Sequence, residues 1–361
     1  MVEKQYHRFL VEQGKQTGEL VLSQYMGIMT DFHEPNPVLY WVDFLASSLI
    51  GSGLLYLAAL SPNASFMQMA SMIISAILLY RSAIFVHEAY HLGLRLKGFS
   101  LAYNLMFGFL HKLPTYFYRP HKDHHNVHTY GTINDPEYDT LASYPPFTLI
   151  IPLLTMAMFP PFLLIRFGVV PVLLPFIGEK GRLWVFAHCS TLVMNLKYNR
   201  KPPSPREKKE WYIQDGCCFL YNSVLIGLMI THILPWKLLG VWMFTMYLMY
   251  LLNFYRVVVS HRYVSQHQQL DRKQQILDSV TVEGTPYLFW LFPVGLRYHT
   301  LHHLFPLMPY HNLGKAHKVL VNALPENHPY RITLDTSYSE SISKLVENYS
   351  FSRQTNKGRS T

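Results

Sequence analysis

Long apolar runs alternate along this chain with polar segments that contain histidine. Four runs reach the length of about 20 residues that a membrane-spanning helix needs, and we expect helices at about 38–60, 66–86, 218–234 and 237–260. Only Ser61 to Ser65 separate the first two runs, and only Pro235-Trp236 the last two. Such short connections predict two helical hairpins.

Two further apolar segments fit this pattern less well. The run from Leu101 to Leu110 is too short to span a bilayer, so we expect it at the membrane interface or beneath the protein. The run from Tyr144 to Ile177 is longer but contains seven prolines, which interrupt helices. It can form an extra hairpin or a pair of membrane-surface helices, and we favour the surface helices.

The distribution of basic residues predicts which side of the membrane each segment occupies. The N-terminus and the segments at 95–97, 197–209 and 262–273 are rich in Lys and Arg, whereas the hairpin tips are nearly uncharged apart from Lys237. Basic loops stay in the cytoplasm. Both hairpins are therefore expected to return the chain to the cytoplasm in a multi-pass membrane protein.

Composition supports the same class of protein. Half of the residues are hydrophobic and 15% are charged, against about 25% charged in soluble domains. The net charge is +9, but the sequence contains no basic stripe interleaved with aromatic residues. We therefore expect contact with anionic lipid headgroups and not with nucleic acid. The three cysteines form no C-x-x-C pair, which argues against a disulfide framework and against thiolate metal sites.

These patterns predict an all-α integral membrane protein, with two transmembrane hairpins that carry a cytosolic helical cap. We expect a cytosolic segment at 1–37, one membrane domain at 38–320 and a cytosolic tail at 321–361 that is disordered after Ser350. The first 37 residues lack the apolar core of a signal peptide. Membrane targeting is therefore expected to come from the first spanning helix.

Three histidine clusters follow the apolar runs. They are His87-x-x-x-His91, His121-x-x-His124-His125 and His299-x-x-His302-His303. Helical residues three and four apart share one face, so each cluster can direct its imidazoles at one point. Imidazole binds iron, zinc, copper and nickel, and eight rings exceed the ligands of one tetrahedral zinc. We therefore predict a two-metal centre just below the bilayer, within reach of a lipid chain whose C–H bonds iron and dioxygen can oxidise.

The order and spacing of these clusters resemble the membrane fatty acid desaturase superfamily from about Asp31 to Leu320. The stretch 292–306, Phe-Pro-Val-Gly-Leu-Arg-Tyr-His-Thr-Leu-His-His-Leu-Phe-Pro, is similar to the last histidine box of bacterial members, which implies a bacterial inner membrane. The resemblance implies two iron ions with O2 as co-substrate. It assigns the iron ligands to His87, His91, His121, His124, His125, His299, His302 and His303, and a ninth to His261, just after the last membrane helix.

The sequence departs from the family at one position. In the acyl-CoA desaturases an Asn four residues before the equivalent of His261 supports the second iron, whereas this chain has Val257 there. Asn253 lies on nearly the same helical face and could substitute for it through a water molecule. The departure leaves the coordination and the outcome of the reaction open.

Several other residues are weaker candidates. His128, His311 and His317 could be additional ligands, although surface or structural roles are the simpler interpretation. Carboxylates near the clusters could accept the outer N–H of ligand imidazoles, or could instead cap helices and loops. They are Glu88, Asp123, Asp135, Glu137 and Asp139.

Three functions are compatible with these observations. The first is an oxygen-dependent desaturase of a lipid acyl chain, with no catalytic residues beyond the metal ligands and no organic cofactor. The second is a hydroxylase of a lipid, carotenoid or alkane that uses the same centre. Because the chain has no His-Pro-Gly-Gly haem segment, either enzyme needs a separate ferredoxin- or cytochrome-like donor with its reductase. The third, a non-catalytic metal transporter, is disfavoured because the clusters lie beyond the helix ends.

Overall fold

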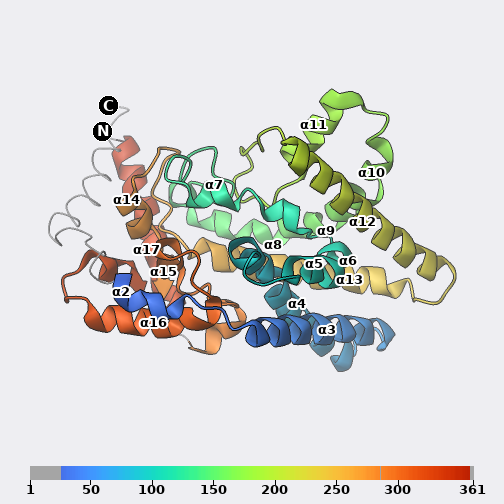
Figure 1. Cartoon of the computed structure of the whole chain (residues 1–361), viewed down its shortest axis with the longest axis horizontal. Coiled ribbons are helices and arrows are strands. Elements are labelled where there is room, and N and C mark those ends of the chain that lie inside the picture. The colour runs from blue at the N-terminus through green and yellow to red at the C-terminus, as the bar shows by residue number, and fades with distance from the viewer. Residues whose placement is uncertain (1–25, 285, 358–361) are drawn as a thin grey trace.

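The computed structural model describes residues 26–284 and 286–357 and is mostly helical. Helices α3, α12 and α13 extend toward one side of the molecule, whereas α7 and α14–α17 gather at the other (Figure 1). Most of the segment at 1–37, including its predicted basic N-terminus, lies outside the described residues. The architecture is thus an apolar helical layer with a polar cap on one end.

The long helices are α3 (Pro37–Leu60), α4 (Phe66–Leu92), α12 (Pro205–Ile230), α13 (Lys237–Val258) and α17 (Tyr338–Lys357). Shorter helices precede or connect them: α2 (Met26–Met29), η2 (Thr30–Phe32), α5 (Phe99–Tyr103), the π-helix η3 (Asn104–Gly108), α6 (Phe109–His111), η4 (Thr115–Tyr118) and α7 (His121–His125). The middle of the chain forms η5 (Leu141–Ser143), η6 (Pro146–Ile150), α8 (Pro152–Thr155), η7 (Met156–Met158), α9 (Phe159–Gly168), α10 (Val170–Leu173) and α11 (Gly178–Cys189).

The last third contains α14 (Arg272–Asp278), η8 (Pro286–Trp290), α15 (His299–Leu304), α16 (Tyr310–Ala323) and η9 (Pro329–Thr333). Two short strands, β1 (Thr281–Val282) and β2 (Leu334–Asp335), pair in parallel with Thr281 opposite Leu334. The predicted all-α fold is therefore correct apart from this small sheet.

Within the described residues, five helical stretches are long and apolar enough to cross a membrane. Four overlap the predicted helices. The helix that contains the third predicted span is longer than that span, because α12 begins at Pro205. There Ser204 and Glu207 form a capping box ahead of a proline at the first helical position, so the helix starts within the charged segment.

The fifth stretch, Pro146–Leu173, has the highest mean hydropathy of the five, 2.1, and consists of short helical pieces. One end packs against α13, where the Tyr255 hydroxyl donates to the Leu149 carbonyl at 3.2 Å. The other end reaches α12, where the Arg166 guanidinium pairs with Asp215 at 2.9 Å. The stretch thus lies against two membrane helices, and its placement along the membrane surface stays a prediction.

Small and polar residues join α3 to α4. The Ser75 hydroxyl donates to the Gly51 carbonyl at 2.7 Å, and a side chain at Gly51 would meet Leu79 at 2.9 Å. Close approach of backbones at small residues is typical of helices that associate inside membranes. At the end nearer the cap, Arg81 binds Asp43 through two hydrogen bonds. This pair fixes the first hairpin beside the cap.

The segment after residue 320 packs onto the domain, which differs from the expected tail. Asp335 is fully buried and accepts hydrogen bonds from Arg262 and Lys344. Helix α17 continues to Lys357, so the expected disorder after Ser350 is wrong over the described residues. A polar sequence here forms a helix because its start contributes Leu345 to a buried apolar cluster.

We predict that Asp215→Asn lowers the free energy of unfolding by about 3–5 kcal/mol, because it leaves the buried guanidinium of Arg166 without a counter-charge. Denaturant unfolding in detergent micelles measures the effect. Lys208→Ala is the control: it removes an exposed ion pair with Glu179 and should cost less than about 1 kcal/mol. Equal losses in both variants would contradict the prediction.

Candidate metal centre

Nine histidines converge beneath the helical layer, and they are the nine that the sequence singles out. Their nitrogens form two groups, and within each group one ligand atom per residue lies within 4.8 Å of all the others. The first group is His87, His91, His121, His125 and His302, and the second group is His124, His261, His299 and His303. Seven of the nine residues are buried, and His91 and His125 are half-buried.

Four chain segments position these rings. The last two turns of α4 carry His87 and His91, and α7 and α15 carry the two H-x-x-H-H clusters. His261 lies three residues after the end of α13. The helical spacing explains how the rings are divided. His121 and His125, four residues apart, face the first group, while His124 faces the second.

The Nε2 atoms of the first group face one another. Neighbouring Nε2 atoms are 2.9 Å apart between His87 and His302, 3.1 Å between His302 and His125, and 2.9 Å between His125 and His121. In the second group, His299 Nε2 lies 2.9 Å from His261 Nε2 and 3.1 Å from His303 Nε2. Two nitrogens bound at right angles to a metal ion, each about 2.0–2.1 Å from it, also lie about 3 Å apart. The spacing therefore fits metal coordination.

Carboxylates hold the outer nitrogens of several rings. The Nδ1 atom of His121 lies 2.5 Å from Glu137, and that of His124 lies 3.0 Å from Asp135. When these carboxylates accept the Nδ1 proton, Nε2 keeps its lone pair and becomes an acceptor. A cation placed between the Nε2 atoms would satisfy these lone pairs. The residues present thus fit a pair of metal ions.

Sequence reasoning found part of this outer shell. It proposed Glu88, Asp135 and Glu137, and each lies beside a ring of the centre; Glu88 is 3.3 Å from His87 Nδ1. It missed the partners of His261, whose Nδ1 lies 2.8 Å from the Tyr130 hydroxyl and 3.4 Å from Asp278. Asp278 ends α14, and no spacing in the sequence connects it with a histidine cluster.

Burial controls the charge of the rings. Removal from water, and then the neighbouring histidines, lower the pKa of His121, His299 and His303 well below the usual value. Burial also opposes the charged form of His124, but Asp135 beside it raises its pKa overall. Burial raises the pKa of Glu137 to about 7. Most rings are therefore neutral near pH 7, the form in which imidazole binds metals.

The weaker candidates lie outside the centre. His128 is exposed, His311 accepts from the backbone of Asn36 at 2.9 Å, and His317 lies 2.8 Å from Glu283. Asp123 accepts from the Tyr198 hydroxyl at 3.1 Å, and Asp139 caps its own loop at Thr140. Contacts with other protein groups or with solvent therefore account for these five residues without a role at the metal centre.

Asn253, the expected substitute for the family asparagine, accepts a hydrogen bond from Arg256 at 2.7 Å. It belongs to neither group of nitrogens, which contain histidines alone. A role through a water molecule stays a prediction.

Comparisons with known proteins agree with this centre. The family model described as fatty acid desaturase matches residues 64–334, which include all nine histidines. The chain is also 30% identical over 325 residues to a ceramide hydroxylase of Caulobacter vibrioides (strain NA1000 / CB15N), covering 89% of this chain and 92% of that protein. No solved structure matches the chain. The chain belongs to the fatty acid desaturase family of membrane di-iron oxidoreductases.

Proposed function

We propose that this protein is an enzyme that uses O2 to oxidise a C–H bond in a lipid chain, and that the nine histidines bind two iron ions. The observation that carries the proposal is the pair of nitrogen groups, whose neutral rings face one another at about the spacing of metal ligands. Iron bound there would supply the activation of O2 and the oxidation of an unreactive C–H bond.

The protein's own residues orient and protect this centre. Glu137 and Asp135 fix the tautomers of His121 and His124, so that each ring presents Nε2 to its metal ion. Tyr130 and Asp278 hold His261 in the same way. Burial of seven of the nine rings limits access of water. Electrons come from a separate ferredoxin- or cytochrome-like protein and its reductase.

The membrane arrangement follows from the same centre. All four segments that carry ligands meet at one end of the helical layer, which requires an even number of crossings between them. Two hairpins, α3–α4 and α12–α13, satisfy this requirement and leave the centre on the cytoplasmic face, where basic residues gather. The substrate then enters from the bilayer, and the protein resides in the bacterial inner membrane.

Two possible endings of the reaction, hydroxylation and desaturation, are supported by different comparisons. Similarity over 89% of the chain to a protein named ceramide hydroxylase favours hydroxylation of a ceramide-like lipid, and we place this ending first. The family description favours formation of a double bond, and desaturation is the second candidate. Both endings use the same centre, so the mass of the product separates them.

Expression in a bacterial host supplied with defined ceramides and acyl lipids tests the function. Lipid mass spectrometry should show a product heavier by one oxygen atom, or lighter by two hydrogen atoms if desaturation is the ending. The matched control is His302→Ala, because the Nε2 atom of His302 lies beside those of His87 and His125 in the first group. Unchanged lipids with iron and an electron donor present would reject the function.

We predict that His302→Ala and His124→Ala each abolish turnover and reduce bound iron, while the helical fold remains. Each removes a ligand from a different group. Metal analysis of purified protein measures the iron, and circular dichroism measures the helices. His232→Ala, at a residue that belongs to neither group, should keep its iron and most of its activity. Normal activity in either of the first two variants contradicts the ligand assignment.

Asp135→Asn should weaken iron binding about 10–100-fold, because an amide orients the His124 ring less well than a carboxylate. Competition with a chelator measures the affinity. Asp139→Asn is the matched control, since Asp139 lies in the same loop but contacts Thr140 and Tyr144 instead. Equal iron affinity in the two variants would contradict the role given to Asp135.

A further inference from the structure

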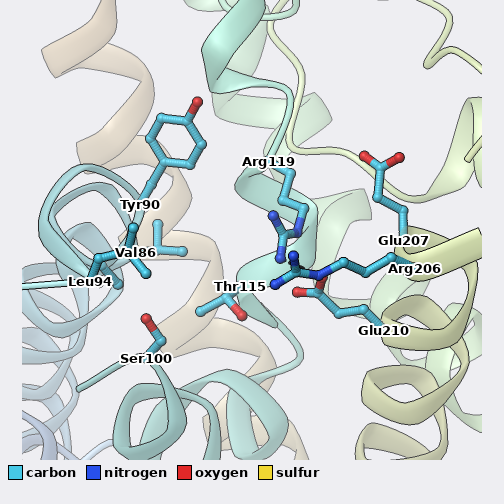
Figure 2. Close-up of a pocket in the computed structure, with 11 residues that line it drawn as sticks. Val86, Tyr90, Leu94, Ser100, Thr115, Arg119, Arg206, Glu207 and Glu210 are labelled. Atoms are coloured by element: carbon cyan, nitrogen blue, oxygen red, sulfur yellow. Dashed lines mark ion pairs between the residues drawn. The ribbon is translucent and has the colours of Figure 1, made fainter. Parts of the chain in front are cut away.

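A pocket of about 520 Å³ lies where α4 ends and α12 begins. Residues of α4, including Val86, Ala89 and Tyr90, form one side, and α12 contributes Arg206, Glu207 and Glu210 to the other. Figure 2 shows the side chains of Arg119 and Arg206 extending toward each other, with Thr115 nearby and Val86 and Leu94 opposite. The pocket therefore has an apolar wall and a charged wall.

The pocket adjoins the metal centre. Tyr90 lines it, and the Tyr90 ring lies 5.0 Å from the ring of His91 and 5.4 Å from that of His121, measured between centroids. Arg119, on the opposite wall, stands only two residues before His121 in the chain. A molecule in the pocket is thus separated from the first group of histidines by about one aromatic ring.

The pocket has exposed apolar side chains on one side. Leu94, which lines it, is 99% exposed, and Leu101, next to the lining residue Ser100, is 62% exposed. Their place beside the end of a membrane helix makes this the side from which we infer that a lipid enters. The charged wall comes from the start of α12, at the polar end of the helical layer. A lipid here can keep its chain beside α4 while its head contacts α12.

The charges of the lining balance. Arg119 pairs with Glu210, Glu207 accepts from the backbone and hydroxyl of Ser204, and Arg206 forms no ion pair among the described residues. Two guanidinium groups therefore stand against two carboxylates, beside the hydroxyls of Ser100 and Thr115. A multiply anionic head such as a phosphate would lie close to both carboxylates, at a cost from like charges. A neutral head with hydroxyl and amide groups finds donors and acceptors together.

We propose that this pocket binds the polar head of the lipid substrate, and that the head is neutral and carries hydroxyl and amide groups. The proposal rests on the proposed function and adds where the head of the substrate binds and which of its groups the pocket recognises. Because the pocket is so close to the centre, the oxidised carbon lies within the first few carbons next to the head and not in the middle of the chain.

The first test measures binding to the full-length, iron-loaded protein in lipid nanodiscs. The probes are a fluorescent ceramide and a fluorescent phosphatidic acid of equal chain length. Arg206→Gln should weaken ceramide binding about tenfold, the value of one charge-assisted hydrogen bond. Lys209→Gln, on the same helix and exposed outside the pocket, is the matched control and should bind normally. Iron content should be the same in all three proteins.

Glu210→Gln gives an independent result. It leaves Arg119 without its carboxylate, so the lining gains one net positive charge. Binding of phosphatidic acid should then improve, while the unchanged protein should prefer ceramide. Tighter binding of phosphatidic acid by the unchanged protein, or normal ceramide binding by Arg206→Gln, would overturn the proposal.

Product analysis separates this proposal from the proposed function. Tandem mass spectrometry of the oxidised lipid locates the new oxygen or double bond, which we expect next to the head. A product modified in the middle of the chain would reject the pocket assignment and leave the function intact. Normal ceramide binding and full iron content without any product would reject the function instead.

Discussion

The whole structure depends on holding neutral imidazoles with their lone pairs directed at one another. Such an arrangement is unfavourable without a cation, since the rings can neither hydrogen-bond to every neighbour nor reach water. The chain achieves it by giving the outer nitrogens to buried partners such as Asp135, Glu137 and Tyr130. These partners fix where the inner nitrogens of their rings point, so metal binding needs little rearrangement of those rings.

Buried charge holds the surrounding frame together as well. Asp278 accepts from the hydroxyls of both Tyr130 and Tyr138, and Asp335 binds Arg262, which follows His261 directly. Farther from the centre, Asp215 joins Arg166 to α12. In each case a carboxylate connects segments distant in sequence, and its loss would leave the partner unsatisfied. Polar contacts of this kind act together with apolar burial, such as that of Leu291 and Leu345 against Val258, to join the cap to the helices.

The sequence was most informative where spacing alone determines geometry. Histidines three and four residues apart on a helix must share a face, so spacing alone named the eight rings of the three clusters, and apolar length located four of the membrane helices. His261 belongs to no such pattern and was named only through the resemblance to the family. Asp278 could not be found, because its contact with His261 depends on how α14 packs. The start of α12 was not predicted, because the capping box of Ser204 and Glu207 begins a helix even though charged residues follow it. The segment at 146–173 remained ambiguous, since prolines permit both short spanning and surface helices.

The division of ligands between the two groups has a consequence for assembly. Helix α7 gives His121 and His125 to the first group and His124 to the second, and α15 gives His302 to the first and His299 and His303 to the second. Each of these helices therefore contributes ligands to both positions, and a displacement of α7 or α15 moves ligands of both groups at once. Metal binding at one position is therefore thermodynamically linked to metal binding at the other.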